Sequence, residues 1–281
     1  MAAVFWSFLV TILDRAYPER PVKFVFLMLV LGQFLLISGH IGAIIVDTAA
    51  PSETTAIFRE FFGLSTEGNA PTWFSSLLFT LIGLVCGAPY WVEGYQASKA
   101  ATIRKTRPAW LVFAALFMFL SFDETSQFHE RLDWLMSGLE EGGQASASAI
   151  ADGAEERSFY QYLLIYIPVL GAFGLAMAWF VMRRFQRPVT AFLFLAGMAG
   201  FALKLVIESF EQWSLSTRWF GHSLYLEAVI VEMSCLFTGA TLILTALLSY
   251  LFGLADGFFP TGRRLAMERN VTAYGEFKRP I

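Results

Sequence analysis

The sequence predicts an all-α protein: a polytopic membrane bundle of six transmembrane helices with both termini in the cytoplasm. The composition is the first reason, because 56% of the residues are hydrophobic and only 15% are charged, whereas soluble domains carry about 25% charged residues. The second is a series of apolar runs near the roughly 20 residues that a helix needs to cross a bilayer. The third is the clustering of basic residues beside alternate ends of these runs.

The N-terminal segment, residues 1–21, does not resemble a secretory signal, because it lacks a basic start and a small-residue cleavage site. We expect Met1–Tyr17 to form a short interfacial helix, with Phe5, Trp6 and Phe8 on its buried face, or else an extra turn. This segment would lie in the cytoplasm or at its membrane surface.

Residues 22–254 form the predicted transmembrane domain, and residues 255–281 a polar cytoplasmic tail. Some of the six runs reach spanning length only by including polar residues. The predicted spans are Val22–Val46, Trp73–Trp91, Trp110–Leu132, Tyr160–Met182, Val189–Phe210 and Leu224–Leu254. The positive-inside rule then requires an even number of spans and cytoplasmic termini.

The outward connections are acidic and are expected to be solvated. The first carries Glu53 and Glu60, and the second, Ser137–Arg157, is rich in glycine, alanine and serine. Small residues four apart predict close helix contacts. These pairs are Gly83 with Gly87 and Gly39 with Ala43.

The stretch from Ser121 to Arg131 holds the most unusual residues of the chain. It follows an apolar run, Trp110–Phe122, that is too short to cross a bilayer alone. A spanning helix would therefore carry its next polar residues below the lipid surface, where ionisable groups are costly and become candidates for function. These residues are Asp123, Glu124, His129 and Glu130.

The predicted topology adds polar residues from other helices to this outward end. They are Lys204, Glu208 and Glu211 of the fifth span, His222, Glu227 and Glu232 of the sixth, and His40 of the first. Several have simpler interpretations: a structural Lys204–Glu208 ion pair, a water-facing Glu227 and a packing role for His40. A network that caps the third helix is a further alternative.

Helical periodicity sorts the residues of the third span into two faces. Asp123, Ser126, Gln127 and Glu130 share one face, and His129 lies beside it. Glu124 falls on a neighbouring face with Arg131, so these two charges could neutralise each other.

Several carboxylates in a pocket of low dielectric need protons or a cation. Carboxylates with imidazole suit a divalent ion of iron, manganese or zinc, whereas protonation would indicate a proton or cation path. Neither an H-E-x-x-H motif nor paired Glu-x-x-His motifs are present. The predicted metal ligands are Asp123, His129, Glu130, Glu208, Glu211 and Glu232, with Ser126 or Gln127 as catalytic residues that orient ligands or substrate.

The segments Trp73-Phe74-Ser75-Ser76 and Asp123-Glu124-x4-His129-Glu130 resemble a group of uncharacterised bacterial multi-pass membrane proteins. This resemblance implies the inner membrane of a bacterium and no particular activity. The chain is also similar to ceramidase-like membrane hydrolases, which place serine, aspartate and histidine around zinc. Ser126, Asp123 and His129 would be the matching residue types, although the H-x-x-x-H pair of those enzymes is absent.

Our leading functional hypothesis is a metal-dependent membrane enzyme that acts on a lipid or another hydrophobic substrate near the periplasmic face. The alternatives are an accessory subunit of a larger bioenergetic membrane complex and a proton- or cation-coupled transporter. The expected partners are membrane lipids and, for the second hypothesis, other membrane subunits. We expect no nucleic-acid partner.

Overall fold

The computed structural model describes residues 19–66, 68–96, 107–126, 128, 154–216, 218–219, 222–223 and 225–256. Within them, side-chain surroundings are not described for 95–96, 154–166, 209–225 and 255–256. The described part is helical apart from one strand pair, which confirms the predicted all-α class. The elements are α2 (Arg20–Ala49), α3 (Glu53–Phe61), α4 (Ala70–Gln96), α6 (Ala109–Ser126), α8 (Ala154–Arg184), α9 (Pro188–Ser216), β1 (Arg218–Trp219), β2 (His222–Ser223) and α10 (Tyr225–Asp256).

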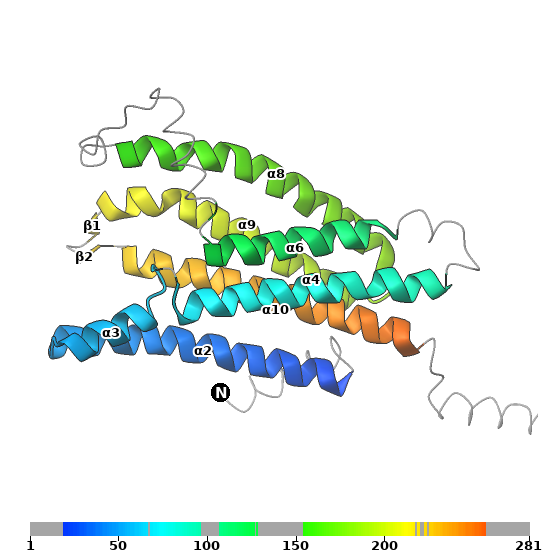
Figure 1. The fold of residues 1–281 in the computed structure, drawn as a ribbon, viewed down its shortest axis with the longest axis horizontal. Coiled ribbons are helices and arrows are strands. Elements are labelled where there is room, and N and C mark those ends of the chain that lie inside the picture. The colour runs from blue at the N-terminus through cyan, green and yellow to red at the C-terminus, as the bar shows by residue number, and fades with distance from the viewer. Residues whose placement is uncertain are drawn as a thin grey trace, which may run out of the picture.

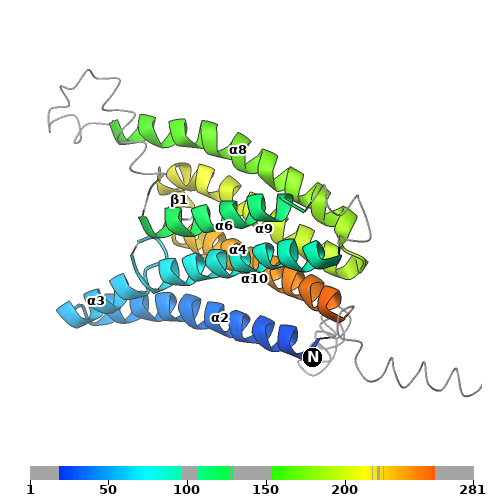
Figure 2. The same ribbon diagram turned by 45° about the vertical axis from the view of Figure 1, so that its right-hand side comes forward.

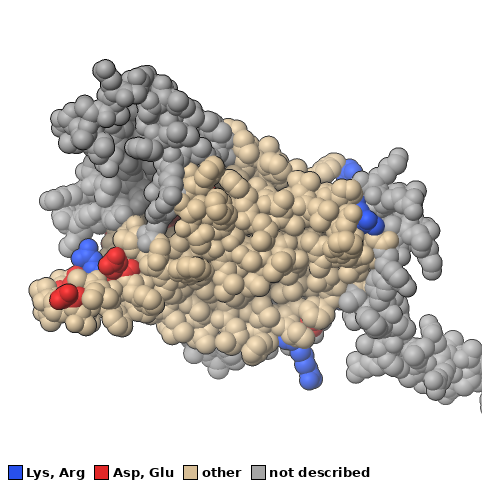
Figure 3. Space-filling model, viewed as in Figure 1, with Lys and Arg blue, Asp and Glu red and all other residues tan. Residues whose placement is uncertain are grey.

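Six of these helices, all except α3, are long and apolar enough to cross a membrane. They run alternately up and down the bundle (Figures 1 and 2). We call the end that carries α3 the α3 end, and the opposite end, where α8 finishes at Arg184, the arginine end. On the face drawn in Figure 3, the described charged residues lie toward the two ends and leave a broad uncharged belt between them. This distribution suits a bundle that lies in a bilayer.

Helix α10 lies at the centre of the bundle. In its spanning window 61% of the residues are buried, against 11% for α2 and for the described half of α8. It packs against α9, α4 and α2, while α6 packs against α4 and α8 against α9. The core therefore joins α4, α6, α9 and α10, and α2 and α8 flank it.

Glycines bring α9 and α10 into backbone contact. A Cβ atom added to Gly197 would lie 2.7 Å from the carbonyl oxygen of Gly239, and one added to Gly239 would lie 2.8 Å from that of Gly197. Side chains cannot occupy that space, so glycine is required at both positions. Of the predicted small-residue contacts, Gly83 lies against Met118 of α6 and Gly39 against Phe62.

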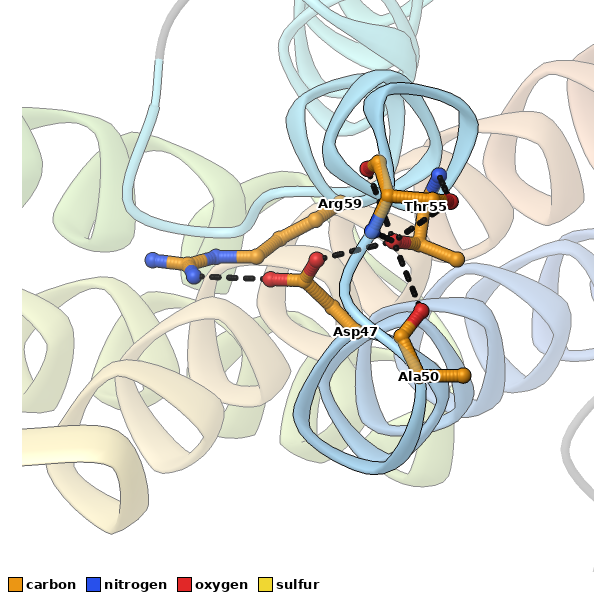
Figure 4. A network of polar contacts seen from close by, with 5 residues as sticks. Asp47, Ala50, Thr55 and Arg59 are labelled. Carbon is orange, nitrogen blue, oxygen red and sulfur yellow. Dashed lines mark hydrogen bonds and ion pairs between the residues drawn. The ribbon is translucent and has the colours of Figure 1, made fainter.

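Helix α3 differs from the prediction, because the acidic connection after the first span contains a helix. Ser52 and Thr55 form a capping box in which each residue's side chain bonds the other's backbone N–H. Figure 4 shows how Asp47 of α2 holds this helix: it accepts a hydrogen bond from the Thr55 hydroxyl at 2.9 Å and pairs with Arg59 at 3.0 Å. Local capping therefore stabilises helix where composition alone favoured a loop.

Several predictions concern segments that lie wholly or mostly outside the described residues. The expected interfacial helix Met1–Tyr17 lies outside the described residues, as do most of the second outward connection and nearly all of the C-terminal tail. Within that connection, Ala154–Arg157 already belong to α8. Helix α8 therefore begins before the apolar run of the predicted fourth span, whereas its candidate span among the described residues is Ile167–Arg184.

A pocket that ends in a cluster of charged residues

Four ionisable residues from α6 and α9 meet at the α3 end of the bundle. Asp123 is buried and Glu124 half-buried in the last turns of α6. Lys204 and Glu208 lie one helical turn apart on α9, and Glu232 of α10 is buried nearby. We call these five residues the acid–lysine cluster.

Lys204 occupies the middle of this cluster. Its Nζ lies 2.6 Å from Oε2 of Glu208 and 3.4 Å from Oε1 of Glu232. Glu124 also acts on it electrostatically, from α6. An ammonium group therefore links α9 to α10 and faces α6, and it supplies a positive charge that neighbouring carboxylates need in a low-dielectric setting.

Hydroxyl groups of α4 fix the position of Glu124. Ser75 Oγ donates a hydrogen bond to Glu124 Oε1 at 2.5 Å. One residue further, Ser76 Oγ lies 2.8 Å from Ser121 Oγ, which in turn lies 2.7 Å from Thr80 Oγ1. The two serines of the W-F-S-S segment thus bind the helix that carries Asp123 and Glu124. The hydrogen bond from Ser75 to Glu124 thus connects the W-F-S-S segment with the described part of the segment that begins at Asp123.

A pocket of about 500 Å³ opens beside the cluster, between α6, α8 and α9. Its walls are mostly apolar, and the ionisable residues that line it within the described part of the chain are Asp123, Glu124, Lys204 and Glu208. Pockets of 300–1,000 Å³ with apolar walls and a few polar groups are typical of small-molecule sites. Its apolar lining includes Phe79, Phe117, Phe173, Met177, Met198 and Phe201.

The pocket exists because α8 meets α6 mainly toward the arginine end. There, Phe180 of α8 packs against Trp110 and Phe113 of α6, with ring centroids 4.9 and 5.5 Å apart. Toward the α3 end, α8 presents Gly171 and Gly174 to the pocket. A Cβ atom at Gly171 would meet nothing within 4 Å, so this glycine leaves space that a larger residue would fill, whereas a Cβ atom at Gly174 would lie 3.0 Å from Cε of Met198 on α9.

Three of the six predicted metal ligands have described side chains, and all three belong to the acid–lysine cluster. Asp123 and Glu208 line the pocket, whereas Glu232 reaches the cluster through Lys204. His129 and Glu130 lie outside the described residues, and Glu211 belongs to α9 without a described side chain. Within the described part of the chain, no three histidine, cysteine, aspartate or glutamate residues are grouped as metal ligands.

Of the two predicted catalytic residues, the structure describes Ser126 but not Gln127. The Oγ atom of Ser126 is buried and has no hydrogen-bond partner among the described residues. Gln127 lies outside them. His40 binds a different part of the fold, since its Nδ1 accepts a hydrogen bond from the backbone N–H of Leu64 at 3.3 Å, as the packing alternative expected. Glu227 is exposed, also as its simpler interpretation expected.

A second polar cluster, at the arginine end, was missed by the sequence interpretation. Glu93 of α4 is 1% exposed and pairs with Arg184 of α8 at 3.1 Å. Its Oε1 accepts hydrogen bonds from Trp110 Nε1 at 3.1 Å and from the Tyr250 hydroxyl at 2.7 Å. One carboxylate thereby joins four helices. The signal was available, because a lone glutamate near the end of an apolar run needs a partner.

Comparison with known families adds one finding. Residues 24–251 match the family described as Domain of unknown function (DUF8692). The chain belongs to this family. Neither the curated proteins nor the solved structures provide a match. Because the DUF8692 segment runs from α2 into α10, it contains both polar clusters and the whole pocket.

Proposed function

We propose that this DUF8692 protein binds a lipid-like molecule in the pocket between α6, α8 and α9. The observation that supports the proposal is an apolar pocket that ends at charged side chains. A molecule with a hydrocarbon chain and one polar group would match both parts, with its chain against the phenylalanine and methionine side chains and its polar group near Lys204. Such a molecule could enter sideways from the bilayer.

The proposed setting is the inner membrane of a bacterium, with the arginine end in the cytoplasm. The positive-inside rule supports that orientation, because Lys23, Arg107, Arg183, Arg184 and Arg187 belong to the arginine end. The pocket's polar end would then lie near the periplasmic surface. At that depth, a bound lipid would keep its head group near its normal level in the bilayer.

The enzyme hypothesis stays a prediction within this proposal. Lys204 already places one cation among Glu208, Glu232 and Glu124, so binding does not require a metal. A metal held through His129, Glu130 or Glu211 also stays a prediction. The accessory-subunit and transporter hypotheses stay predictions too. We prefer ligand binding to both because of the apolar pocket that ends at charged side chains.

Photolabelling of the full chain in lipid nanodiscs tests the proposal. A long-chain alcohol that carries a diazirine should label peptides of α6, α8 and α9 that line the pocket. Gly171→Phe should fill the space, because a Cβ atom at Gly171 meets nothing within 4 Å. We expect this variant to lower pocket labelling about fivefold or more, since burial of the probe's chain is lost.

Gly42→Phe is the matched control. Gly42 also has no atom within 4 Å of an added Cβ, but it lies on α2 and does not line the pocket. Its labelling pattern should equal that of the wild type. Equal labelling of the pocket peptides in the wild type and in Gly171→Phe would refute the proposal.

A further inference from the structure

Helix α3 keeps three large apolar side chains on its surface, which we call the apolar row. They are Ile57, Phe58 and Phe61, which are 60%, 56% and 55% exposed, and helical geometry places them within an arc of about 100°. Glu53 and Glu60, both exposed, lie on another side of the same helix. A helix with separate apolar and charged sides is typical of a boundary between water and lipid.

Other side chains attach α3 to α2. Thr55 and Arg59 both bind Asp47, as Figure 4 shows. Phe62, which follows the helix, packs directly on Gly39, where an added Cβ atom would lie 2.6 Å from Phe62 Cδ1. More than half of each residue in the apolar row remains outside these contacts.

The direction of α3 sets the depth of the apolar row. Thr55, near the start of the helix, binds Asp47, whereas Phe62, just after its end, lies beside Gly39. The helix therefore runs back along α2 toward the middle of the bundle. The step from Asp47 to Gly39 is eight residues of α2, or about 12 Å. The last turn of α3 thus lies deeper than its first turn.

The length of α2 places the bilayer surface beside α3. This helix has 30 residues, about 45 Å, whereas the hydrocarbon layer is roughly 30 Å thick and takes about 20 residues. Counted from Val22, at the arginine end, about 20 residues end near Ile41. The apolar row therefore lies at the level of lipid head groups, with Phe61 nearest the hydrocarbon and Glu53 nearest the water.

We propose that α3 is an interfacial anchor whose partner is the lipid surface at the α3 end of the bundle. The apolar row enters the head-group layer, which removes apolar area from water, while the acids of α3 stay in water. Ile41 and Ile45 of α2, also exposed, continue the apolar surface at the same level. Three side chains are far fewer than the roughly 20–30 residues that each partner contributes to a stable protein interface. Lipid is therefore a better partner for the apolar row than a second copy of the chain.

Spin labels on α3, in the full chain in lipid nanodiscs, test this anchor. Ile57→Cys and Phe61→Cys place a nitroxide in the apolar row, and Glu53→Cys, on the charged side of the same helix, is the matched control. Molecular oxygen concentrates in hydrocarbon, whereas a neutral nickel chelate stays in water. We expect the ratio of oxygen to nickel accessibility to be about fivefold or more higher in Phe61→Cys than in Glu53→Cys, because apolar groups favour the membrane. The ratio for Ile57→Cys should lie between them.

Two controls keep the measurement decisive. The wild type, treated with the same label, gives the background from Cys86 and Cys235. Phe61 contacts the Phe62 ring, with centroids 5.0 Å apart, so Phe61→Cys removes a packing contact. If that variant does not fold, Ile57→Cys alone is compared with Glu53→Cys and should still show the higher ratio.

Two results would overturn the anchor. High nickel accessibility at all three labelled positions would show that α3 stands in water. Low accessibility to both oxygen and nickel in the apolar row would show that protein, rather than lipid, covers it. Neither result bears on ligand binding in the pocket, which the photolabelling of Gly171→Phe tests separately.

Discussion

Replacement of Glu93 by glutamine should destabilise the protein strongly, although glutamine has nearly the same shape. The change keeps an oxygen for the hydrogen bonds from Trp110 and Tyr250 and removes the negative charge that faces Arg184. The arginine side chain is 16% exposed and would retain its charge without this partner. The perturbation therefore isolates one buried ion pair.

The magnitude follows from the burial of both partners. The Glu93 side chain is 2% exposed, and removal of one member of a buried ion pair typically costs about 3–5 kcal/mol. In a protein of this size, a loss of 1 kcal/mol lowers the thermal midpoint by about 2 °C or more. The lower estimate of about 3 kcal/mol therefore corresponds to a fall in the midpoint of about 6 °C. Arg184→Gln should lower the midpoint further, because it leaves the more deeply buried charge unpaired.

Thermal unfolding in detergent, followed by tryptophan fluorescence, measures these shifts. The double variant Glu93→Gln with Arg184→Gln should lose clearly less than the sum of the single losses, since neither charge is then buried alone. Glu53→Gln, on the short helix α3, serves as a surface control and should move the midpoint by about 1 °C or less. Additive losses in the double variant, or a wild-type midpoint in Glu93→Gln, would refute the reasoning.

Three further predictions concern the glycine contact and the acid–lysine cluster. Gly197→Ala should lower the thermal midpoint by several degrees, because overpacking typically costs about 1–3 kcal/mol, whereas Gly253→Ala, with open space around the new Cβ, should not. Ser75→Ala should destabilise by about 1.5–3 kcal/mol, the range for a hydrogen bond to a charged group, and an unchanged midpoint would show that the bond to Glu124 contributes nothing. Treatment with a chelator should leave the midpoint unchanged, because Lys204 supplies the cation for Glu208 and Glu232; a fall of several degrees would favour the metal hypothesis instead.

Hydropathy and length were sufficient to predict the six long helices, because each must be apolar over most of its own length. The same criterion failed for α3, which has only nine residues and mixes Phe58 and Phe61 with charged neighbours. Its start was still visible in the sequence, since Ser52 and Thr55 have the spacing of a capping box. Local hydrogen bonds rather than hydropathy specify this element.

The sequence predicted the Lys204–Glu208 ion pair, which is present, but it did not predict the partners that these residues have on other helices. Topology placed Lys204, Glu208 and Glu232 at the same end of the bundle as Asp123, and three of these are in direct contact. Periodicity indicates only Arg131 as a partner for Glu124, whereas in the structure Glu124 accepts a hydrogen bond from Ser75 of another helix and faces Lys204. A single helix's periodicity contains no information about neighbouring helices, so such partners require the tertiary structure.

The pocket walls formed by α9 and by α8 differ in how freely they can move, because the glycine contact fixes α9 against α10. Backbone lies directly on backbone at Gly197 and Gly239, so α9 cannot approach or tilt against α10 without a clash. Helix α8 has no such constraint at Gly171, where an added Cβ meets nothing. We therefore expect the pocket to accommodate ligands of different thickness by displacement of α8 alone, while α9 and Lys204 keep their position.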